Sequence, residues 1–154
     1  MTYTVRKATL EDLPVLLEFE QGLIKVERPM DPTIREGEIS YYDVGEFIRS
    51  DDAEVFVVEQ EGRILASGCV RIKPDRHYLK HKRMGHLGFM FVPEEHRGKG
   101  LNGLIIEKLV DWCKSRDLQE LRLDVYQSNA PAIRAYEKAG FSKHLITMRL
   151  NIEG

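Results

Sequence analysis

The segment from Val92 to Gly103 constrains this chain most, because it reads as a strand end, a glycine-rich turn and a helix start. An apolar, strand-like run from Leu87 stops before Pro93, and an amphipathic helix follows. The turn holds three glycines and two cations: Gly98, Gly100, Gly103, Arg97 and Lys99. The first amides of a helix lack partners within it, and its dipole attracts anions. Because glycines let a ligand approach these amides closely, the segment predicts a phosphate-binding turn.

Read literally, the glycines follow the Gly-x-Gly-x-x-Gly pattern of nicotinamide-binding oxidoreductases. That site needs its first glycine close to the end of the first strand of a parallel sheet. Here five residues separate Val92 from Gly98. Upstream, the apolar runs 54–58 and 64–72 are joined by Gln60–Arg63, which predicts an antiparallel hairpin. A dinucleotide fold is therefore disfavoured, although a nicotinamide-binding oxidoreductase stays as an alternative.

The periodicity of apolar residues predicts alternating strands and helices along the chain. Apart from the hairpin, we expect strands over 4–8, 84–92, 121–126 and 145–152, helices over 10–26, 101–115 and 132–139, and a helix within 39–50. This order predicts an α/β fold with a mixed, mainly antiparallel sheet flanked by helices. No repeat or linker divides residues 1–154, so we expect a single domain that buries about 70% of its extended-chain surface.

Composition excludes several classes of function. A formal net charge of −2 is unlike that of a general nucleic-acid binder, so no nucleic-acid partner is expected. Cys69 and Cys113 lie inside apolar runs and predict reduced core thiols. His77, His81 and His86 have no ligand spacing of a metal site, so no metal is expected. Without a signal peptide or a long apolar span, we expect no membrane partner and a cytoplasmic protein.

Two motifs carry a family resemblance. The stretch Arg97–Asn102 resembles the coenzyme A loop of the GCN5-related N-acetyltransferases (GNAT), Arg/Gln-x-x-Gly-x-Gly/Ala, although Asn102 stands at a position that is usually small. The stretch Asp124–Phe141 resembles the later signature of that family, a strand followed by Asn-x-x-Ala-x-x-x-Tyr and Gly-Phe. Both motifs occur in the order and at the separation typical of the family. The resemblance implies a GNAT-type fold, with acetyl-CoA as cosubstrate and no metal.

The resemblance also implies which residues bind the cosubstrate. The pantetheine arm would lie along the backbone of the strand that ends at Val92, and the Asn129 side chain, which also suits a helix N-cap, would contact that arm. The implied binding residues are Met90, Phe91, Val92, Arg97, Gly98, Lys99, Gly100, Leu101, Asn102, Gly103, Asn129 and Tyr136.

The implied reaction is direct attack of a primary amine on the thioester. Tyr136 matches the general acid of the family, which protonates the leaving thiolate. For the general base, His86 matches a strand position that holds glutamate in histone-type members, and Asp124 matches an acidic base of terminal-amine relatives; water is the third option. The acceptor is a small-molecule or protein amine, and residues 27–50 and 73–83 would select it. A non-catalytic acyl-CoA-binding or sensing module is the alternative, and a homodimer is one expectation because dimers are common among relatives.

Overall fold

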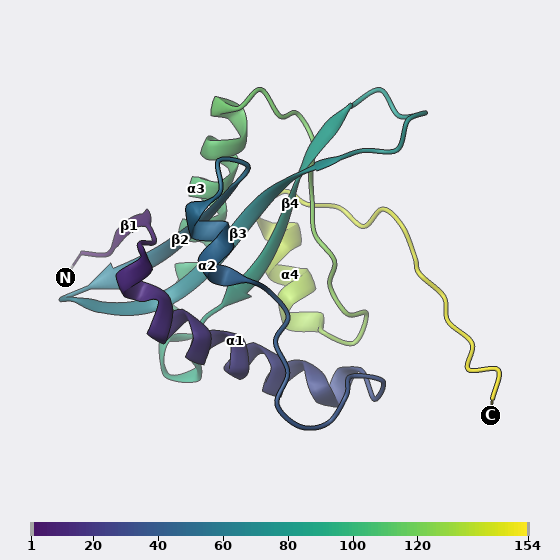
Figure 1. Ribbon diagram of the computed structural model, residues 1–154, viewed down its shortest axis with the longest axis horizontal. Helices are drawn as coiled ribbons and strands as arrows, with labels where there is room; N and C mark the ends of the chain where they lie inside the picture. The colour runs from purple at the N-terminus through teal and green to yellow at the C-terminus, as the bar shows by residue number, and fades with distance from the viewer. Residues whose placement is uncertain (1, 154) are drawn as a thin grey trace.

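A five-stranded sheet in the order β1-β2-β3-β4-β5 forms the centre of the computed structural model, which describes residues 2–153 (Figure 1). The strands are β1 (Thr4–Lys7), β2 (Ala53–Gln60), β3 (Arg63–Pro74), β4 (Arg83–Phe91) and β5 (Leu121–Arg122). Neighbouring strands are antiparallel except β4 and β5, which are parallel. The mixed, mainly antiparallel sheet is therefore confirmed.

The predicted hairpin is formed by β2 and β3. Its turn consists of Glu61 and Gly62, whose φ angles are 52° and 78°. Two successive positive φ angles match the twist of the flanking strands, and glycine adopts this conformation at low cost.

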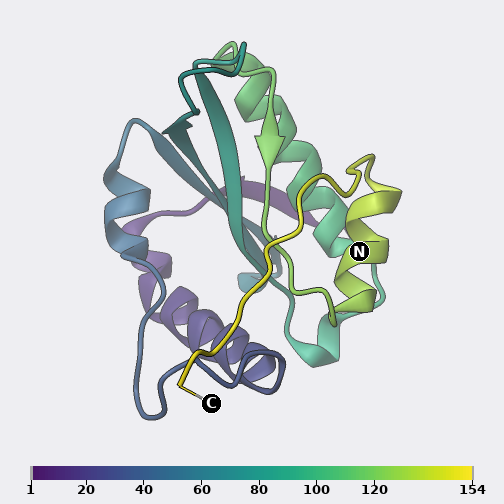
Figure 2. The same ribbon diagram turned by 90° about the vertical axis from the view of Figure 1, so that its right-hand side faces the viewer.

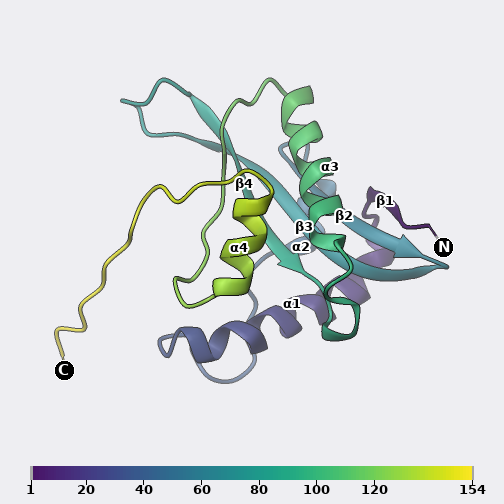
Figure 3. The ribbon, with the colours of Figure 1, turned by 180° about the vertical axis from the view of Figure 1, so that it is seen from behind.

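Helices cover both faces of the sheet. One face is covered by α1 (Leu13–Glu27) and α2 (Val44–Arg49), and the other by α3 (Leu101–Ser115) and α4 (Ala130–Lys138). Figure 3, seen from behind, shows α3 and α4 together on the second face. Single 3₁₀ turns lie at Leu10–Asp12, Arg28–Met30 and Glu94–His96. The limits of α3 match the predicted 101–115, and α4 begins two residues before the predicted 132.

The alternation of side chains along β2 divides the core in two. Val55 and Val57 pack beneath α1 and α2, whereas Phe56 and Val58 pack beneath α3. All four are buried, which explains why this strand reads as a continuous apolar run. The two cysteines are buried and free, as predicted.

Helix α3 approaches β3 closely at Gly68. A Cβ at this position would lie 2.4 Å from Cγ2 of Ile105 and 2.7 Å from Sδ of Met90. Glycine is required here because α3 and the end of β4 occupy the space that a side chain would need.

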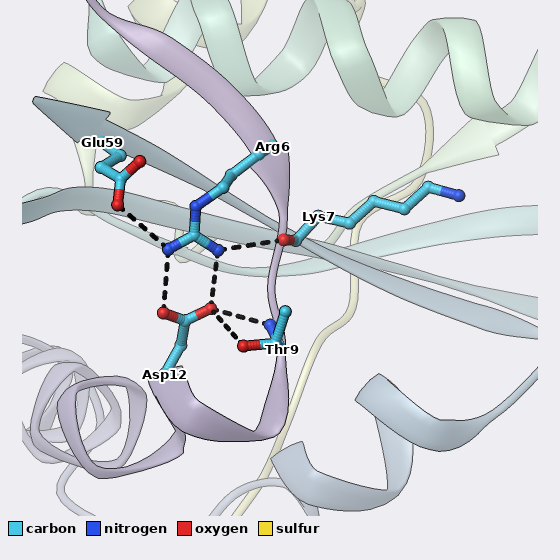
Figure 4. A network of polar contacts seen from close by, with 5 residues as sticks. All are labelled: Arg6, Lys7, Thr9, Asp12 and Glu59. Carbon is cyan, nitrogen blue, oxygen red and sulfur yellow. Dashed lines mark hydrogen bonds and ion pairs between the residues drawn. The ribbon is translucent and has the colours of Figure 1, made fainter. Parts of the chain in front are cut away.

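A network of polar contacts joins the start of the chain to the sheet (Figure 4). Arg6 donates two hydrogen bonds to the Asp12 carboxylate, at 2.8 Å and 3.0 Å, and one to Glu59 at 3.3 Å. The Thr9 amide donates to the same Asp12 carboxylate at 2.7 Å. The network thereby ties β1, the turn before α1, and β2 together.

Two expectations at the C-terminal end were wrong. The strand predicted over 121–126 is limited to Leu121–Arg122, and residues 145–152 form no strand. After α4 the chain continues as an extended segment beside the sheet, and Arg149 within it contacts Asp31 (Figures 1 and 2). Alternation of apolar residues predicted a strand there, but a strand also needs an edge to pair with. Within residues 2–153, no helix combines the length and apolar character needed to cross a membrane.

Candidate active site

Strands β4 and β5 pair over two residues only and then diverge. The pairs are Gly85 with Leu121 and His86 with Arg122. Beyond His86, the edge of β4 that faces β5 has no strand partner among residues 2–153. The predicted pantetheine-binding residues Met90, Phe91 and Val92 follow on this stretch. Apart from the Val92 carbonyl, which Arg97 engages, the backbone groups on this edge are thus free to pair with an extended ligand.

A β-bulge at Phe89 separates the C-terminal end of β4 from the part of the strand that pairs regularly with β3. The register against β3 shifts by one residue between Ser67 and Cys69, and Phe89 has a φ of 54°. Ser67 Oγ donates to the Phe89 carbonyl at 3.0 Å, and the Phe89 amide donates to the Tyr42 hydroxyl at 3.3 Å. Bulges bend a strand and redirect its side chains. The buried Ser67 and the half-buried Tyr42 therefore support this bend.

The glycine turn after β4 has the geometry of an anion site. Gly98 and Gly100 have φ angles of 79° and 77°, in the left-handed region, and Gly100 is the N-cap of α3. The Leu104 amide donates to the Gly100 carbonyl at 3.3 Å, which leaves the amides of 101–103 without helical acceptors. A Cβ at Gly98, Gly100 or Gly103 would meet no atom within 4 Å. The turn is therefore open to a ligand.

The side chains of this turn divide into structural and free groups. Arg97 Nε donates to the Val92 carbonyl at 2.9 Å, which ties the turn to the end of β4. The Leu101 side chain is buried in the core, so only its amide faces the turn. Lys99 is exposed and has no ion-pair partner within residues 2–153. Asn102 is half-buried in the first turn of α3.

Helix α4 carries the second motif. Asn129 accepts a hydrogen bond from the Ala132 amide at 3.3 Å, so its N-cap role is confirmed. The Tyr136 ring is half-buried and lies 5.9 Å from the Phe141 ring, edge-on. Burial raises the pKa of Tyr136 to about 12, and the charge of Glu27 adds to this effect. The phenol is therefore protonated at neutral pH.

The two candidate bases lie next to each other. Nε2 of His86 is 3.5 Å from Oδ2 of Asp124. Parallel pairing places Arg122 beside His86, and Asp124 follows two residues later, just beyond the end of β5. The His86 side chain is 18% exposed, whereas that of Asp124 is 98% exposed.

The surroundings of His86 favour its neutral form. Burial lowers the pKa of His86, and the positive charge of Lys73 lowers it further, while Asp124 raises it. Nδ1 is buried and accepts or donates no hydrogen bond within the described part of the chain. A neutral imidazole beside an exposed carboxylate can accept a proton from a cationic ligand.

Sequence reasoning missed a second group of residues beside α4. The Tyr126 hydroxyl donates to Asp31 at 3.0 Å, and Asp31 also accepts from Thr33 and from Arg149. Tyr126 and Asp31 are 95 positions apart, and no local pattern signals such a contact. Tyr42, which precedes α2, also escaped sequence reasoning, and its hydroxyl supports the bulge at Phe89. Among residues 2–153, no group of three or more potential ligands could hold a metal ion.

Comparison with known proteins gives a consistent family. Residues 21–141 match the acetyltransferase (GNAT) family model. A glucosamine 6-phosphate N-acetyltransferase from Arabidopsis thaliana is 36% identical over 108 residues, which are 67% of this chain and 69% of the plant enzyme. An N-alpha-acetyltransferase from Sulfurisphaera tokodaii is 25% identical over 146 residues, which are 92% of this chain and 81% of that protein.

Solved structures show the same fold. A protein from Bacillus halodurans matches with a TM-score of 0.87 and 20% identity, over 97% of this chain and 99% of that one. A predicted acetyltransferase from Clostridium acetobutylicum, solved with acetyl-CoA, matches with a TM-score of 0.73 and 19% identity, over 99% and 97%. Because the family model spans most of the chain and both motifs, this chain belongs to the acetyltransferase (GNAT) family and is an N-acetyltransferase.

Proposed function

We propose that this protein transfers the acetyl group of acetyl-CoA to a primary amine by direct attack of the neutral amine on the thioester. One observation carries the proposal: the unpaired edge of β4 joins an open amide turn at Gly98–Gly103 to the His86–Asp124 pair. A ligand extended along this edge would hold its diphosphate at the turn and its thioester toward His86.

The turn supplies the groups that a diphosphate requires. The amides of residues 101–103 and the dipole of α3 attract negative charge, and Lys99 is free to add a full charge. Arg97 contributes mainly by fixing the turn through Val92, since its Nε is already engaged there. The pantetheine arm pairs with the backbone groups of Met90, Phe91 and Val92 that Arg97 leaves free. The Asn129 side chain lies within the motif that contacts this arm in related enzymes.

We assign the role of general base to His86. An amine of pKa about 10.4 must lose a proton before it attacks, which costs about 4.6 kcal/mol at pH 7. The lowered pKa of His86 keeps its imidazole neutral at that pH and ready to accept the proton. Asp124, almost fully exposed beside it, attracts the cationic amine and stabilises the imidazolium that forms.

We assign the role of general acid to Tyr136. A phenol of pKa about 12 is always protonated when the thiolate leaves, but it is a weaker acid than free phenol. Apolar surroundings raise the pKa of a neighbouring thiol as well, which reduces the difference in pKa between the phenol that donates the proton and the thiolate that accepts it. The proton lost by the amine and the one gained by sulfur thus pass through different residues.

The acceptor can be identified by a screen of amines. Purified protein with acetyl-CoA is offered sugar phosphate amines, polyamines, amino acids and peptide N-termini, and free thiol is measured. Release that depends on one class of amine supports the proposal. Thermal stabilisation by acetyl-CoA without thiol release from any amine would instead indicate a binding or sensing module.

A further inference from the structure

One carboxylate near Tyr136 has no charged partner in the chain. Glu27, the last residue of α1, is half-buried and forms no ion pair among residues 2–153. Burial raises the pKa of Glu27; the nearby Tyr41 hydroxyl lowers it and the charge of Asp31 raises it. Buried polar groups normally have partners, so a carboxylate without one indicates a role.

Three tyrosines from different parts of the chain lie close to Glu27. Burial raises the pKa of Tyr41, Tyr126 and Tyr136, and in each case the negative charge of Glu27 adds to this effect. Such an effect requires proximity, so the carboxylate lies near all three phenols. Figures 2 and 3 show the end of α1 below α4 and the chain that leads into it. Glu27 thus lies on the side of the site that holds the proposed general acid.

The hydroxyl of Tyr41 also lacks a partner. Its oxygen is buried and close to Glu27, but the two groups do not complete a hydrogen bond. The backbone here is held firmly, because the buried Glu20 carboxylate accepts hydrogen bonds from the amides of Tyr41 and Tyr42, at 3.0 Å and 2.8 Å. A hydroxyl and a carboxylate without partners therefore meet at one place. A donor from outside the chain would satisfy both.

The neighbouring cations of the chain are engaged elsewhere. Arg28 follows Glu27 directly, but its guanidinium donates to two backbone carbonyls of the loop after α1. Arg149 donates to Asp31 at 3.1 Å and to Thr33 at 2.9 Å. Glu27 is therefore left for a cation that the chain does not supply. An ammonium group beside a half-buried carboxylate and aromatic rings gains from both.

We propose that Glu27 and Tyr41 form a subsite for a second positive charge on the acceptor, so that the protein acetylates amines that carry another cationic group. This inference rests on the acetyl transfer proposed above. The reacting nitrogen must be neutral, and a carboxylate beside it would favour its protonated form. Glu27 therefore holds the ammonium that does not react, while His86 and Asp124 receive the nitrogen that does. The second ammonium stays protonated and takes no part in the transfer.

The test compares matched acceptors. With acetyl-CoA, thiol release is measured for a series of linear diamines and for the monoamines of the same chain length. In the wild type, kcat/KM should be at least about tenfold higher for the best diamine than for its monoamine. Glu27→Gln keeps the shape of the side chain but removes its charge, and should abolish most of this preference. Glu18→Gln, the matched control, removes an exposed charge from the same helix and should keep the wild-type ratio.

Three kinetic results would overturn the subsite. The first is an equal kcat/KM of the wild type for diamines and monoamines. The second is a preference for diamines that persists in Glu27→Gln. The third is an equal fall for both kinds of amine in Glu27→Gln, which would place Glu27 in the chemical step and not in recognition.

Binding measured without transfer separates this inference from the proposed reaction. Isothermal titration of the best diamine into protein saturated with CoA involves no acetyl group. Wild type and Glu18→Gln should bind the diamine, and Glu27→Gln should bind it at least about tenfold more weakly. Tyr41→Phe should also weaken binding while the fold stays intact, because its hydroxyl has no partner to lose among the described residues.

The two proposals can then fail separately. Diamine binding that depends on Glu27, without thiol release from any amine, would support the subsite and overturn the transferase proposal. Thiol release from monoamines, without diamine binding, would overturn the subsite and leave the proposed reaction standing.

Discussion

At Gly103 a side chain can be added without disturbing the fold. A substitution there can therefore change ligand binding without changing the stability of the protein. The residue has helical geometry, and a Cβ there meets no atom within 4 Å. Gly98 and Gly100 differ, because their positive φ angles would strain any other residue. Gly103 is thus the glycine of the turn at which a charge can be introduced cleanly.

We expect Gly103→Glu to abolish stabilisation by acetyl-CoA. At saturation of about 100 times Kd, the wild type should gain about 2.7 kcal/mol. A carboxylate in the first turn of α3 is favourable for the free helix but repels a bound diphosphate. Thermal shifts with and without acetyl-CoA measure both effects, and Gly103→Gln is the neutral control. A full shift in Gly103→Glu would place the ligand elsewhere.

The pH dependence of turnover distinguishes His86 from Asp124. If His86 is the base, kcat rises as pH increases through the lowered pKa of His86, below about 6.5. Asp124 raises that pKa, so Asp124→Asn should move the acidic limb of the profile to lower pH while activity persists. His86→Gln should remove the limb and reduce kcat by about a hundredfold or more. Loss of activity in Asp124→Asn with an active His86→Gln would reverse the assignment.

The substitution Tyr136→Phe removes only the phenol hydroxyl and so tests its role as the general acid. The ring contact with Phe141 is retained, and no hydrogen bond of the hydroxyl is lost within the described residues, so stability should change little. We expect kcat to fall by about a hundredfold, because the thiolate then leaves without an acid. Isothermal titration with acetyl-CoA should give a nearly unchanged Kd. Unchanged turnover would remove Tyr136 from the reaction.

At the scale of elements, short sequence patterns predicted the features that are determined by residues close together in the chain. The limits of α3 follow from the glycines before it and its apolar periodicity, and the hairpin follows from Glu61–Gly62. The bulge at Phe89, by contrast, is supported by Ser67 and Tyr42 from other segments, and no local pattern predicts it. The prediction of a strand over 145–152 was wrong for a related reason. Alternation of apolar and polar residues specifies the two faces of a strand but not the strand with which it pairs.

The contact of α3 with β3 predicts a packing defect for Gly68→Ala. The new methyl would lie 2.4 Å from Ile105 and 2.7 Å from Met90, so the helix or the strand must shift. We expect a loss of about 1–3 kcal/mol in the free energy of unfolding, measured with urea. In a double-mutant cycle, Ile105→Ala should cost less in the Gly68→Ala background than alone, because it removes the clash. Additive losses would contradict this packing.

At the scale of the molecule, the site is assembled from segments that the sheet brings together. His86 comes from β4, Asp124 from the chain after β5, Tyr136 from α4, and the open amides from α3. The family resemblance predicts these residues for the candidate site, His86 from its strand position and Asp124 and Tyr136 from the second motif, but not the 3.5 Å approach of His86 to Asp124. That approach depends on the short parallel pairing of β4 with β5, which a single sequence does not specify.

The stability of the whole chain should depend on pH through Asp12. Two hydrogen bonds from Arg6 lower the pKa of this carboxyl, whose side chain is 10% exposed. A pKa lowered by folding adds stability above the unfolded value, near 3.9, and this contribution is lost as pH falls through the folded value. Asp12→Asn should therefore cost about 2 kcal/mol in the free energy of unfolding at pH 7.

The cost of Asp12→Asn should shrink as the pH is lowered below the folded pKa of Asp12, because the wild-type carboxyl is then protonated too. Urea unfolding of both proteins at pH 7 and at about pH 2 measures the difference. Glu59→Gln is the control, because Glu59 accepts only one bond from Arg6, at 3.3 Å, and is 30% exposed, so it should cost under about 1 kcal/mol. An equal cost of Asp12→Asn at both pH values would mean that Asp12 contributes through its hydrogen bond with the Thr9 amide, and not through its charge.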